Sequence, residues 1–367
     1  MTGTPALPEL TTLGAALARL RPLDEVALAS ARERQALLTK PRGALGVLED
    51  VSIQLAGLAG ECPPPVPGRA VVAVFAADHG VYAQGVTPWP QEVTLQMVAN
   101  LVAGGAAVNA LAGQLGARVV VVDVGVAGPL DPAPGLVEMR VRDGSRDLST
   151  GPAMTDAEVR AALDTGVTVA AQLVAEGHRC LLTGDMGIAN TTASAALIAA
   201  FTGADAATVT GRGTGVDDAT LRRKVDVVSG ALVLHAEVVA GRDDDPIAVL
   251  AALGGLEHAA ITGFVIGAAA LRVPVILDGV IAGAAALAVQ AIAPVALSAC
   301  IAGHRSSEPG HAVALAALGL RPLVELDLRL GEGTGAVLAL PLVQAAAAAL
   351  RNMATFDAAG VTDKGGA

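Results

Sequence analysis

Short apolar runs rich in Val and Ile alternate with Ala-rich stretches along most of this 367-residue chain. The runs are apolar on both faces, which is typical of strands that helices cover on both sides of a sheet. Strands separated by helices predict right-handed crossovers and therefore a mainly parallel sheet. The predicted strands are residues 70–76, 118–124, 180–183, 273–277, 295–299 and 323–328.

The composition limits how this sheet can pack and what it can bind. Hydrophobic residues make up 53% of the chain but aromatic residues only 2%, so the core must be built from Ala, Val and Leu. The formal net charge is −11 and no basic run occurs, which argues against nucleic acid as a partner. Any phosphate must therefore be held by local devices, such as a helix N-terminus and one or two cations.

Two features concern the compartment. The three cysteines lie far apart without a CxxC pair, and no signal peptide is recognisable at the N-terminus, so a cytoplasmic protein with reduced thiols is expected. Residues 280–303 carry no charge and are long enough to cross a membrane. Because Ala and Gly dominate them and Gln290 and Pro294 interrupt them, a buried layer is the favoured interpretation and a membrane protein the alternative.

Polar or glycine-rich loops follow all six predicted strands. Since parallel sheets bind ligands beyond the carboxyl ends of their strands, these loops together predict one site. Any single loop could be an ordinary turn, because Asp-Gly is common turn chemistry. The loops are Asp78-His79-Gly80, Asp123-Val124-Gly125, Gly184-Asp185-Met186-Gly187, Asp278-Gly279, Gly303-His304-Arg305-Ser306 and Gly331-Glu332-Gly333.

Glu332 stands between two glycines and precedes a predicted helix at 336–350. The glycines leave room for a ligand, and a ligand that excludes water can raise the pKa of the carboxyl toward neutrality. Glu332 is therefore a candidate general base. The alternative, from this segment alone, is a surface glutamate on a glycine turn.

A candidate phosphate site lies where residues 184–192 lead into a predicted helix at 193–201. The free N–H groups at a helix start bind anions such as phosphate. Asn190, Thr191 and Thr192 are also good capping residues, so the alternative is that they only cap the helix.

A second glycine-rich loop and one lysine could complete this phosphate site. The loop containing Gly211 and Gly213 fits neither the Rossmann nor the P-loop pattern, so it is weak evidence alone. Lys224 could place a point charge on a phosphate, with a solvated helix face as the alternative.

The histidines and the single tryptophan leave several interpretations open. No HExxH pattern occurs among the six histidines, and no metal site is predicted. Asp78 and His79 could form a charge relay, hold a metal or be a structural pair at a strand end. Trp89 lies between two prolines ahead of a predicted helix at 91–103, so it could form a flat wall for a planar ligand or a plug over the core.

Eight motifs follow one another over most of the chain, from residue 40 to the end of the helix after Glu332. They are Lys40-Pro41-Arg42-Gly43-Ala44-Leu45-Gly46, Ala77-Asp78-His79-Gly80-Val81, Tyr82-Ala83-Gln84-Gly85-Val86, Gly104-Gly105-Ala106, residues 184–192, Lys224-Val225-Asp226, Leu277-Asp278-Gly279 and Arg329-Leu330-Gly331-Glu332-Gly333. In content and order these motifs resemble the nicotinate-nucleotide–dimethylbenzimidazole phosphoribosyltransferase family of cobalamin lower-ligand synthesis.

The resemblance implies a fold and an assembly. The large domain is expected to be a Rossmann-like three-layer α/β/α unit with a mainly parallel sheet, and both chain ends to form a small helical domain. In this chain residues 1–62 and 346–367 would belong to the small domain and residues 63–345 to the large catalytic domain. The family is a homodimer and uses no metal or other cofactor.

The resemblance also implies an activity. Phosphoribose passes from nicotinate mononucleotide to 5,6-dimethylbenzimidazole with inversion at C1′, giving α-ribazole 5′-phosphate and nicotinate. Glu332 matches the catalytic base, which takes a proton from one nitrogen of the benzimidazole while the other attacks C1′. The nucleotide and its phosphate are expected at Gly184, Asp185, Gly187, Asn190, Thr191, Thr192, Gly211, Gly213 and Lys224. The base is expected at Pro88, Trp89, Met97 and Leu330, and Asp78, His79, His304 and Ser306 are further candidates.

Two residues depart from the family pattern. Asp185 stands where a glutamate is expected, and Trp89 replaces a smaller or tyrosyl residue. The Asp185 carboxylate is one methylene shorter, so a contact to ribose or base could be lost or bridged by water, and Trp89 could reshape the base pocket. A phenolic or purine base is therefore an alternative acceptor. A nucleotide-binding regulatory protein without catalysis is a further alternative, which the variant Glu332→Gln separates from an enzyme.

Overall fold

The computed structural model describes residues 10–362, which include a six-stranded sheet with all neighbouring strands parallel. The strand order is β3-β2-β1-β4-β5-β6. The chain adds strands on one side of β1 and then on the other, so the order reverses between β1 and β4, the kind of position where parallel sheets bind ligands. The strands are β1 (Ala70–Ala77), β2 (Arg118–Gly125), β3 (Leu136–Glu138), β4 (Cys180–Met186), β5 (Val275–Leu277) and β6 (Cys300–Ala302).

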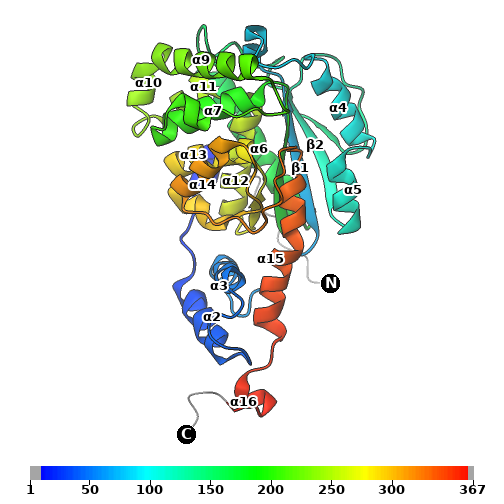
Figure 1. Cartoon of the computed structure of the whole chain (residues 1–367). Coiled ribbons are helices and arrows are strands. Elements are labelled where there is room, and N and C mark those ends of the chain that lie inside the picture. Colours follow the sequence, from blue (N-terminus) through cyan, green and yellow to red (C-terminus); the bar gives the residue numbers. More distant parts are fainter. Residues whose placement is uncertain (1–9, 363–367) are drawn as a thin grey trace.

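Helices cover both faces of the sheet, as the apolar strands predict (Figure 1). In β1, Val71, Ala73 and Phe75 point into one apolar core, and Val72 and Val74 point into the other. The predicted three-layer α/β/α fold is therefore confirmed. One core is shared with α6 (Asp156–Ala175), α7 (Asn190–Thr202), α12 (Leu256–Ala270) and α13 (Val280–Ile292), and the other with α4 (Val93–Val102), α5 (Ala107–Gln114) and α15 (Thr334–Asn352).

A smaller group of helices extends from one end of the sheet, in the lower part of Figure 1. Here α2 (Glu25–Leu37) and α3 (Val47–Ala59) pack against each other and against α15, with a small buried core of their own. The Nε of Arg34 in α2 donates a hydrogen bond of 2.6 Å to the carbonyl of Leu350 in α15. The predicted boundary at residue 345 falls inside α15, so this one helix takes part in both groups.

Local signals set many of the helix starts. Thr155 caps α6 in a capping box with Glu158. Proline begins two further helices, α11 and α14, where its missing N–H costs nothing. The remaining helices are α1 (Leu13–Leu17), α8 (Ala206–Val209), α9 (Asp218–Leu234), α10 (Ala236–Ala240), α11 (Pro246–Leu253), α14 (Pro309–Leu318), α16 (Phe356–Ala359) and the 3-10 helices η1 (Gly80–Gln84) and η2 (Pro294–Ala299).

Two of the predicted strands are wrong. Residues 295–299 belong to the 3-10 helix η2, and the strand β6 is the three residues after it. Pro294 begins η2 because its fixed φ suits a first helical turn and its missing N–H would weaken a strand. Residues 323–328 make only an isolated bridge to the segment after β6, and Asp327, with a left-handed φ of 54°, ends any regular pairing.

The uncharged residues 280–303 do not form one long helix. They divide into α13, η2 and β6, and α13 is buried along nearly its whole length. Two other segments, Val93–Gln114 and Thr334–Asn352, are long and apolar enough to cross a membrane. The first contains two helices, α4 and α5, and the second is α15, which packs against the sheet. Since the core helix of a soluble protein meets the same criteria, they are weak evidence for a membrane span.

Candidate active site

A cavity of about 320 Å³ lies beyond the carboxyl ends of β4, β5 and β6. Its walls come from the end of β4, the loops after β5 and β6, and the glycine-rich loop before α15, with α4 on one side. This is where the strand-end loops are expected to meet. The polar side chains in the lining include Asp185, Asn190, Thr191, Thr214, His304, Ser306, Glu308, Arg329 and Glu332.

Glu332 lies on a turn that is unusual for a residue with a side chain. Its φ is 63°, and those of Gly331 and Gly333 are 81° and 96°, so three consecutive residues have left-handed backbones. For glutamate this conformation costs about 1–2 kcal/mol. Gly184 in β4 makes room for the turn, because a Cβ there would lie 2.5 Å from the carbonyl oxygen of Glu332.

Asp278, directly after β5, holds this turn in place. Its Oδ2 accepts the N–H of Gly333 at 3.1 Å, and its Oδ1 accepts those of Gly335 and Ala336 at 2.8 and 3.0 Å. These N–H groups begin α15, where a helix has no internal partners for its first N–H groups. Asp278 thus caps α15 although it lies far away in sequence, directly after β5. By binding the N–H groups that follow Glu332, it fixes the position of the Glu332 turn.

The Glu332 side chain is buried within the protein and lines the cavity. Burial raises the pKa of its carboxyl above the usual 4.5, the N–H of Val108 at 3.3 Å opposes the rise, and the charge of Asp278 adds to it. A carboxylate with raised proton affinity is suited to act as a general base near neutral pH.

Asp185 is buried in the same wall. Burial raises the pKa of its carboxyl well above the usual 3.8, and the charges of Asp278 and Glu257 add to the rise. Its Oδ2 accepts a hydrogen bond of 2.9 Å from Asn190 Nδ2, which opposes the rise. Asp185 therefore keeps its proton to a higher pH than an exposed aspartate, and in that form it can donate a hydrogen bond to a ligand.

A smaller cavity of about 50 Å³ adjoins the first at the start of α7, and Gly187 and Gly213 line both. Lys224 of α9 lines the smaller one and donates from Nζ to Thr191 Oγ1 at 3.0 Å and to the Gly211 carbonyl at 2.9 Å. Burial lowers the pKa of Lys224 to about 8, and the charge of Glu308 opposes this. The lysine is buried, so its interpretation as part of a solvated helix face is wrong.

Asn190, Thr191 and Thr192 do not cap α7 with their side chains. The N-cap is Ala189, which has a left-handed φ of 77° and no side-chain cap. The first two side chains bond across the cavity walls as described, and the third lies in the core outside both linings. The side chains of Asn190 and Thr191 therefore line the cavities instead of capping the helix. This favours the interpretation that the start of α7 binds a phosphate.

His304 and Ser306 line the larger cavity. His304 Nε2 lies 3.6 Å from Asp278 Oδ1, and neither ring nitrogen has a hydrogen-bond partner among the described residues. The N–H of Ser306 donates to Nδ1 of His311 at 2.9 Å. Burial, with the neighbouring His304, lowers the pKa of His311 to about 3, so this ring stays neutral and accepts that bond. The two ring nitrogens of His304 are thus buried in the cavity wall without a hydrogen-bond partner among the described residues.

The open side of the larger cavity is apolar. Trp89, Met97 and Leu330 line it, and Trp89 and Leu330 are 49% and 56% exposed. A half-exposed Trp89 is a wall of the cavity rather than a plug over the core. Pro88 is exposed and lies outside the lining, in contrast to its neighbour.

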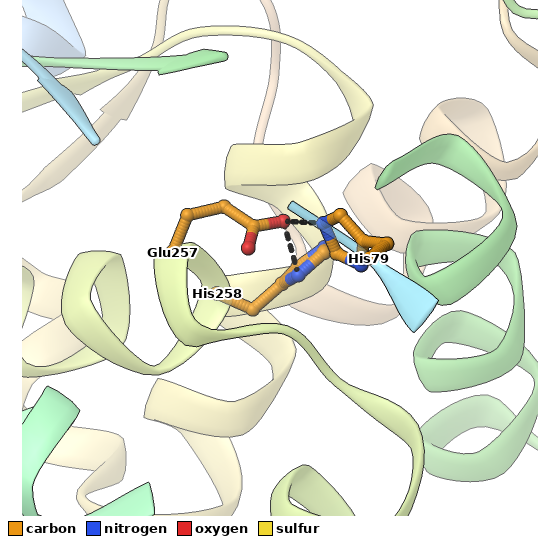
Figure 2. A group of neighbouring side chains, drawn as sticks. All are labelled: His79, Glu257 and His258. Carbon is orange, nitrogen blue, oxygen red and sulfur yellow. Dashed lines mark hydrogen bonds and ion pairs between the residues drawn. The ribbon is translucent and has the colours of Figure 1, made fainter. Parts of the chain in front are cut away.

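Asp78 and His79 lie outside both linings, and each bonds elsewhere. Asp78 accepts the N–H of Ala127 at 2.8 Å. Nε2 of His79 lies 2.7 Å from Oε1 of Glu257, and Nδ1 of His258 lies 2.9 Å from the same oxygen (Figure 2). These three side chains, the His–Glu–His cluster, are fully buried. Their donor atoms lie within 4.8 Å of one another, as in a metal site, but here they bond to each other.

The His–Glu–His cluster supports the start of α7. Nε2 of His258 lies 2.8 Å from Oγ of Ser194, which donates to the Asn190 carbonyl at 3.0 Å. Burial alone would raise the pKa of Glu257, but the two histidines hold it far below its usual value, so the glutamate is ionised. The cluster therefore positions the cavity wall without touching the cavity.

Sequence reasoning placed Asp278 in a strand-end loop without giving it a role, and it missed two other acidic residues around the site, Glu308 and Glu257. Asp278 follows a predicted strand, which was the available signal. Glu308 accepts the N–H of Gly213 at 2.7 Å and stands before the proline that begins α14, a helix-start signal. Glu257 is the one acidic residue of a mostly apolar helix, and such a charge is itself a signal.

Comparisons with known proteins cover nearly the whole chain. A family model described as "Phosphoribosyltransferase" matches residues 20–361. The chain is 60% identical over 361 residues to nicotinate-nucleotide–dimethylbenzimidazole phosphoribosyltransferase of Salinispora tropica, covering 95% of this chain and 98% of the relative. A protein of the same name from Mycobacterium avium is 51% identical over 347 residues, covering 94% and 98%.

A solved structure extends the likeness to three dimensions. The crystal structure of the enzyme of that name from Thermus thermophilus has a TM-score of 0.88 and 48% identity, and the match covers 93% of this chain and 100% of that one. The likeness thus includes the sheet, the loops of the cavity and the smaller group of helices. On this evidence the chain belongs to the nicotinate-nucleotide–dimethylbenzimidazole phosphoribosyltransferase family.

Proposed function

We propose that this protein transfers the phosphoribosyl group of nicotinate mononucleotide to 5,6-dimethylbenzimidazole, with Glu332 as the general base. The observation that carries the proposal is a buried carboxylate of raised pKa, placed between an apolar wall and a small cavity that contains a lysine. The names of relatives that match almost the whole chain support both substrates.

In this proposal the phosphate of the nucleotide binds at the start of α7. Lys224 supplies a positive charge there, and Gly187 and Gly213 let the backbone approach the phosphate closely. The acceptor base lies against Trp89 and Leu330 and presents one nitrogen to Glu332.

The atoms and charges of the proposed reaction balance. Glu332 takes the proton from one nitrogen of the benzimidazole, and the other nitrogen attacks C1′ of the ribose. As the C1′–N bond to nicotinate breaks, its electron pair neutralises the pyridinium nitrogen, so nicotinate leaves and α-ribazole 5′-phosphate remains.

A phenolic or purine base is the alternative acceptor, because Trp89 and Asp185 shape the side of the cavity that the base would occupy. The rates of nicotinate release with 5,6-dimethylbenzimidazole, a phenol and adenine rank the three bases as acceptors.

We also propose a cytoplasmic homodimer. The exposed apolar side chains of α2, Val26 at 76% and Leu37 at 51%, support a partner surface, and three free thiols support a reducing compartment.

The variant Glu332→Gln tests the base assignment. Glutamine keeps the size of the side chain but cannot take the proton, so transfer should fall at least about 100-fold. Nicotinate mononucleotide should still bind, which calorimetric titration measures alongside the assay of nicotinate release. A rate equal to that of the wild type excludes Glu332 as the base.

The matched control is Glu325→Gln. Glu325 is an exposed carboxylate on the segment that leads to the same loop, and it pairs with Arg305 at 2.7 Å. Its replacement should leave the rate unchanged. If the wild type binds the nucleotide but transfers to none of the three bases, the regulatory alternative is favoured instead.

A further inference from the structure

A second cavity, of about 340 Å³, lies at the opposite edge of the sheet, beside the amino ends of β1, β4 and β5. It is as large as the candidate active site, and the two cavities share no lining residue. The eight residues of β1 separate the two edges by roughly 25 Å. The second cavity is therefore a separate place in the molecule, and nothing in the proposed reaction uses it.

Three arginines, one from each of three separate loops, line this cavity. Arg69 directly precedes β1, Arg179 directly precedes β4, and Arg272 stands shortly before β5. Because these strands are neighbours in the sheet, their amino ends bring the three side chains to one edge. Among the described residues no aspartate or glutamate lines the cavity, although the whole chain has a net charge of −11. This local excess of positive charge is suited to an anion.

The backbone at two of the arginines is left-handed, with φ of 47° at Arg69 and 61° at Arg272. Such values are uncommon for residues other than glycine and cost about 1–2 kcal/mol each. Hydrogen bonds between the loops hold this geometry. The N–H of Arg179 donates to the Gly68 carbonyl at 3.2 Å, and Nδ1 of His178 lies 2.6 Å from the Arg69 carbonyl oxygen. The edge is therefore a fixed structure despite its strain.

Two of the guanidinium groups are anchored while keeping donors free. Arg272 donates through its two Nη atoms to the carbonyls of Arg21, Pro22 and Gly57, at 3.2, 2.8 and 2.6 Å. Arg179 donates from Nη1 to the carbonyls of Val174 and His178, at 2.9 and 2.8 Å. Each guanidinium has five N–H donors, so both retain some for a ligand. Arg69 makes no side-chain hydrogen bond or ion pair to another described residue. The floor beneath them is apolar and buried, with Leu55, Leu58 and Val273.

We propose that this cavity is a second binding site, for an organic phosphate whose phosphate group meets the arginines and whose apolar ring rests on the floor. The guanidinium group of arginine can donate two parallel hydrogen bonds to the oxygens of a phosphate. A ligand with an apolar ring should bind more tightly than inorganic phosphate, because the ring buries apolar surface on the floor. The size of the cavity suits a molecule as large as a mononucleotide. The proposal does not depend on the function proposed for the first cavity.

Phenyl phosphate is the probe, titrated into the whole protein at constant ionic strength and followed by calorimetry. The variant combines Arg69→Asn with Arg272→Asn, because asparagine tolerates a left-handed φ and both charges are removed without new strain. We expect this variant to weaken one class of phenyl phosphate sites at least about tenfold. Inorganic phosphate should bind that class more weakly than phenyl phosphate does, since it lacks the ring.

Two controls separate the site from the rest of the protein. Arg118→Gln removes an exposed arginine that begins β2 and pairs with Glu176 outside the cavity, and it should leave binding unchanged. Lys224→Gln alters the small cavity at the start of α7, so it should spare the class of sites that the arginine variant weakens. Failure of transfer in that lysine variant bears on the proposed function alone.

The proposal is overturned by any of three results. The arginine variant, folded by circular dichroism, binds phenyl phosphate like the wild type. All binding of phenyl phosphate disappears in Lys224→Gln. The wild type binds no phenyl phosphate up to millimolar concentration.

Discussion

Three buried carboxyl groups around one cavity differ in what surrounds them. Asp278 accepts three backbone N–H groups, Glu332 accepts one, and Asp185 accepts one side-chain amide. Burial raises the pKa of all three, and at Asp278 the charge of His304 and the three N–H donors oppose the rise. The residues therefore divide into a helix cap, a carboxyl suited to accept a proton and a carboxyl suited to keep one.

Asp185 makes the pH dependence of stability a test of this division. The pKa of its carboxyl is well above the usual 3.8 in the folded chain, so the folded state holds a proton that the unfolded state releases. The contribution of Asp185 to stability should then be fully present below about pH 4 and be lost as the pH rises toward the folded-state pKa. Asp185→Asn removes this loss, so the stability of the variant relative to the wild type should be higher at pH 7 than at pH 4. Urea unfolding at both pH values measures it, and a difference that does not change with pH contradicts the assignment.

At the scale of elements, the start of α15 carries the site. The N–H groups of Gly333, Gly335 and Ala336 bond to Asp278, directly after β5, and that of Thr334 bonds to the carbonyl of Gly331 in its own loop. The helix dipole favours a negative charge at this end, and so does the need of the buried N–H groups for an acceptor. The position of Glu332 thus depends on contact between β5 and α15.

Asp278→Ala should therefore affect both stability and catalysis. Loss of an acceptor for three buried N–H groups should lower the free energy of unfolding by about 2–4 kcal/mol and reduce kcat, because the Glu332 turn loses its support. Asp245→Ala is the matched control, since Asp245 caps α11 through one exposed bond to Ala248. That control should cost about 1 kcal/mol and leave kcat unchanged. Equal kcat values in the two variants would show that Asp278 is structural only.

The long strands were predictable, and only one of the three short ones was. Continuous Val and Ala runs identify β1, β2 and β4, because strands of this length buried on both faces have few alternatives. The strands β3, β5 and β6 have three residues each. The prediction for residues 273–277 contains β5, but β3 was missed and residues 295–299 were predicted as a strand in place of β6. Residues 323–328 look extended in sequence, yet the left-handed Asp327 depends on contacts that sequence does not reveal.

The candidate site was predictable where chain order alone places residues at strand ends. That reasoning gave Glu332, Asp185 and His304, which line one cavity. It could not give the partners, because His79 meets Glu257 across 178 residues of sequence. Such pairings depend on how the helices pack against one another, and no local sequence pattern predicts that packing.

On the scale of the whole molecule, α15 connects the Glu332 turn to the smaller group of helices. Its 19 residues span about 28 Å, from Asp278 at one end to α2 at the other. At the far end Arg34 binds the carbonyls of Leu350 and Arg351, at 2.6 and 3.1 Å, where the helix has no internal partners for them. Both ends of this helix are thus held by side chains from distant parts of the sequence.

Arg34→Ala tests whether the far end is independent of the site. Loss of its bonds should destabilise the group of α2, α3 and α16 by about 1–2 kcal/mol, which faster hydrogen exchange in these helices would report. The first turn of α15 and the rate of transfer should not change, because Asp278 holds that end. Arg32→Ala, an exposed arginine on the same helix, is the control and should alter neither. Faster exchange throughout β1 as well would show that the two groups of helices unfold as one.

The scarcity of aromatic residues gives the protein a built-in optical probe. The chain has one tryptophan and one tyrosine, and the tryptophan, Trp89, is half exposed and lines the candidate active-site cavity. Nearly all of the intrinsic fluorescence excited at the red edge of protein absorption must therefore come from this single position. The emission wavelength and intensity depend on the polarity around the Trp89 ring. Binding of a base on that side of the cavity can therefore be followed in unlabelled protein, in real time and in the absence of the reaction.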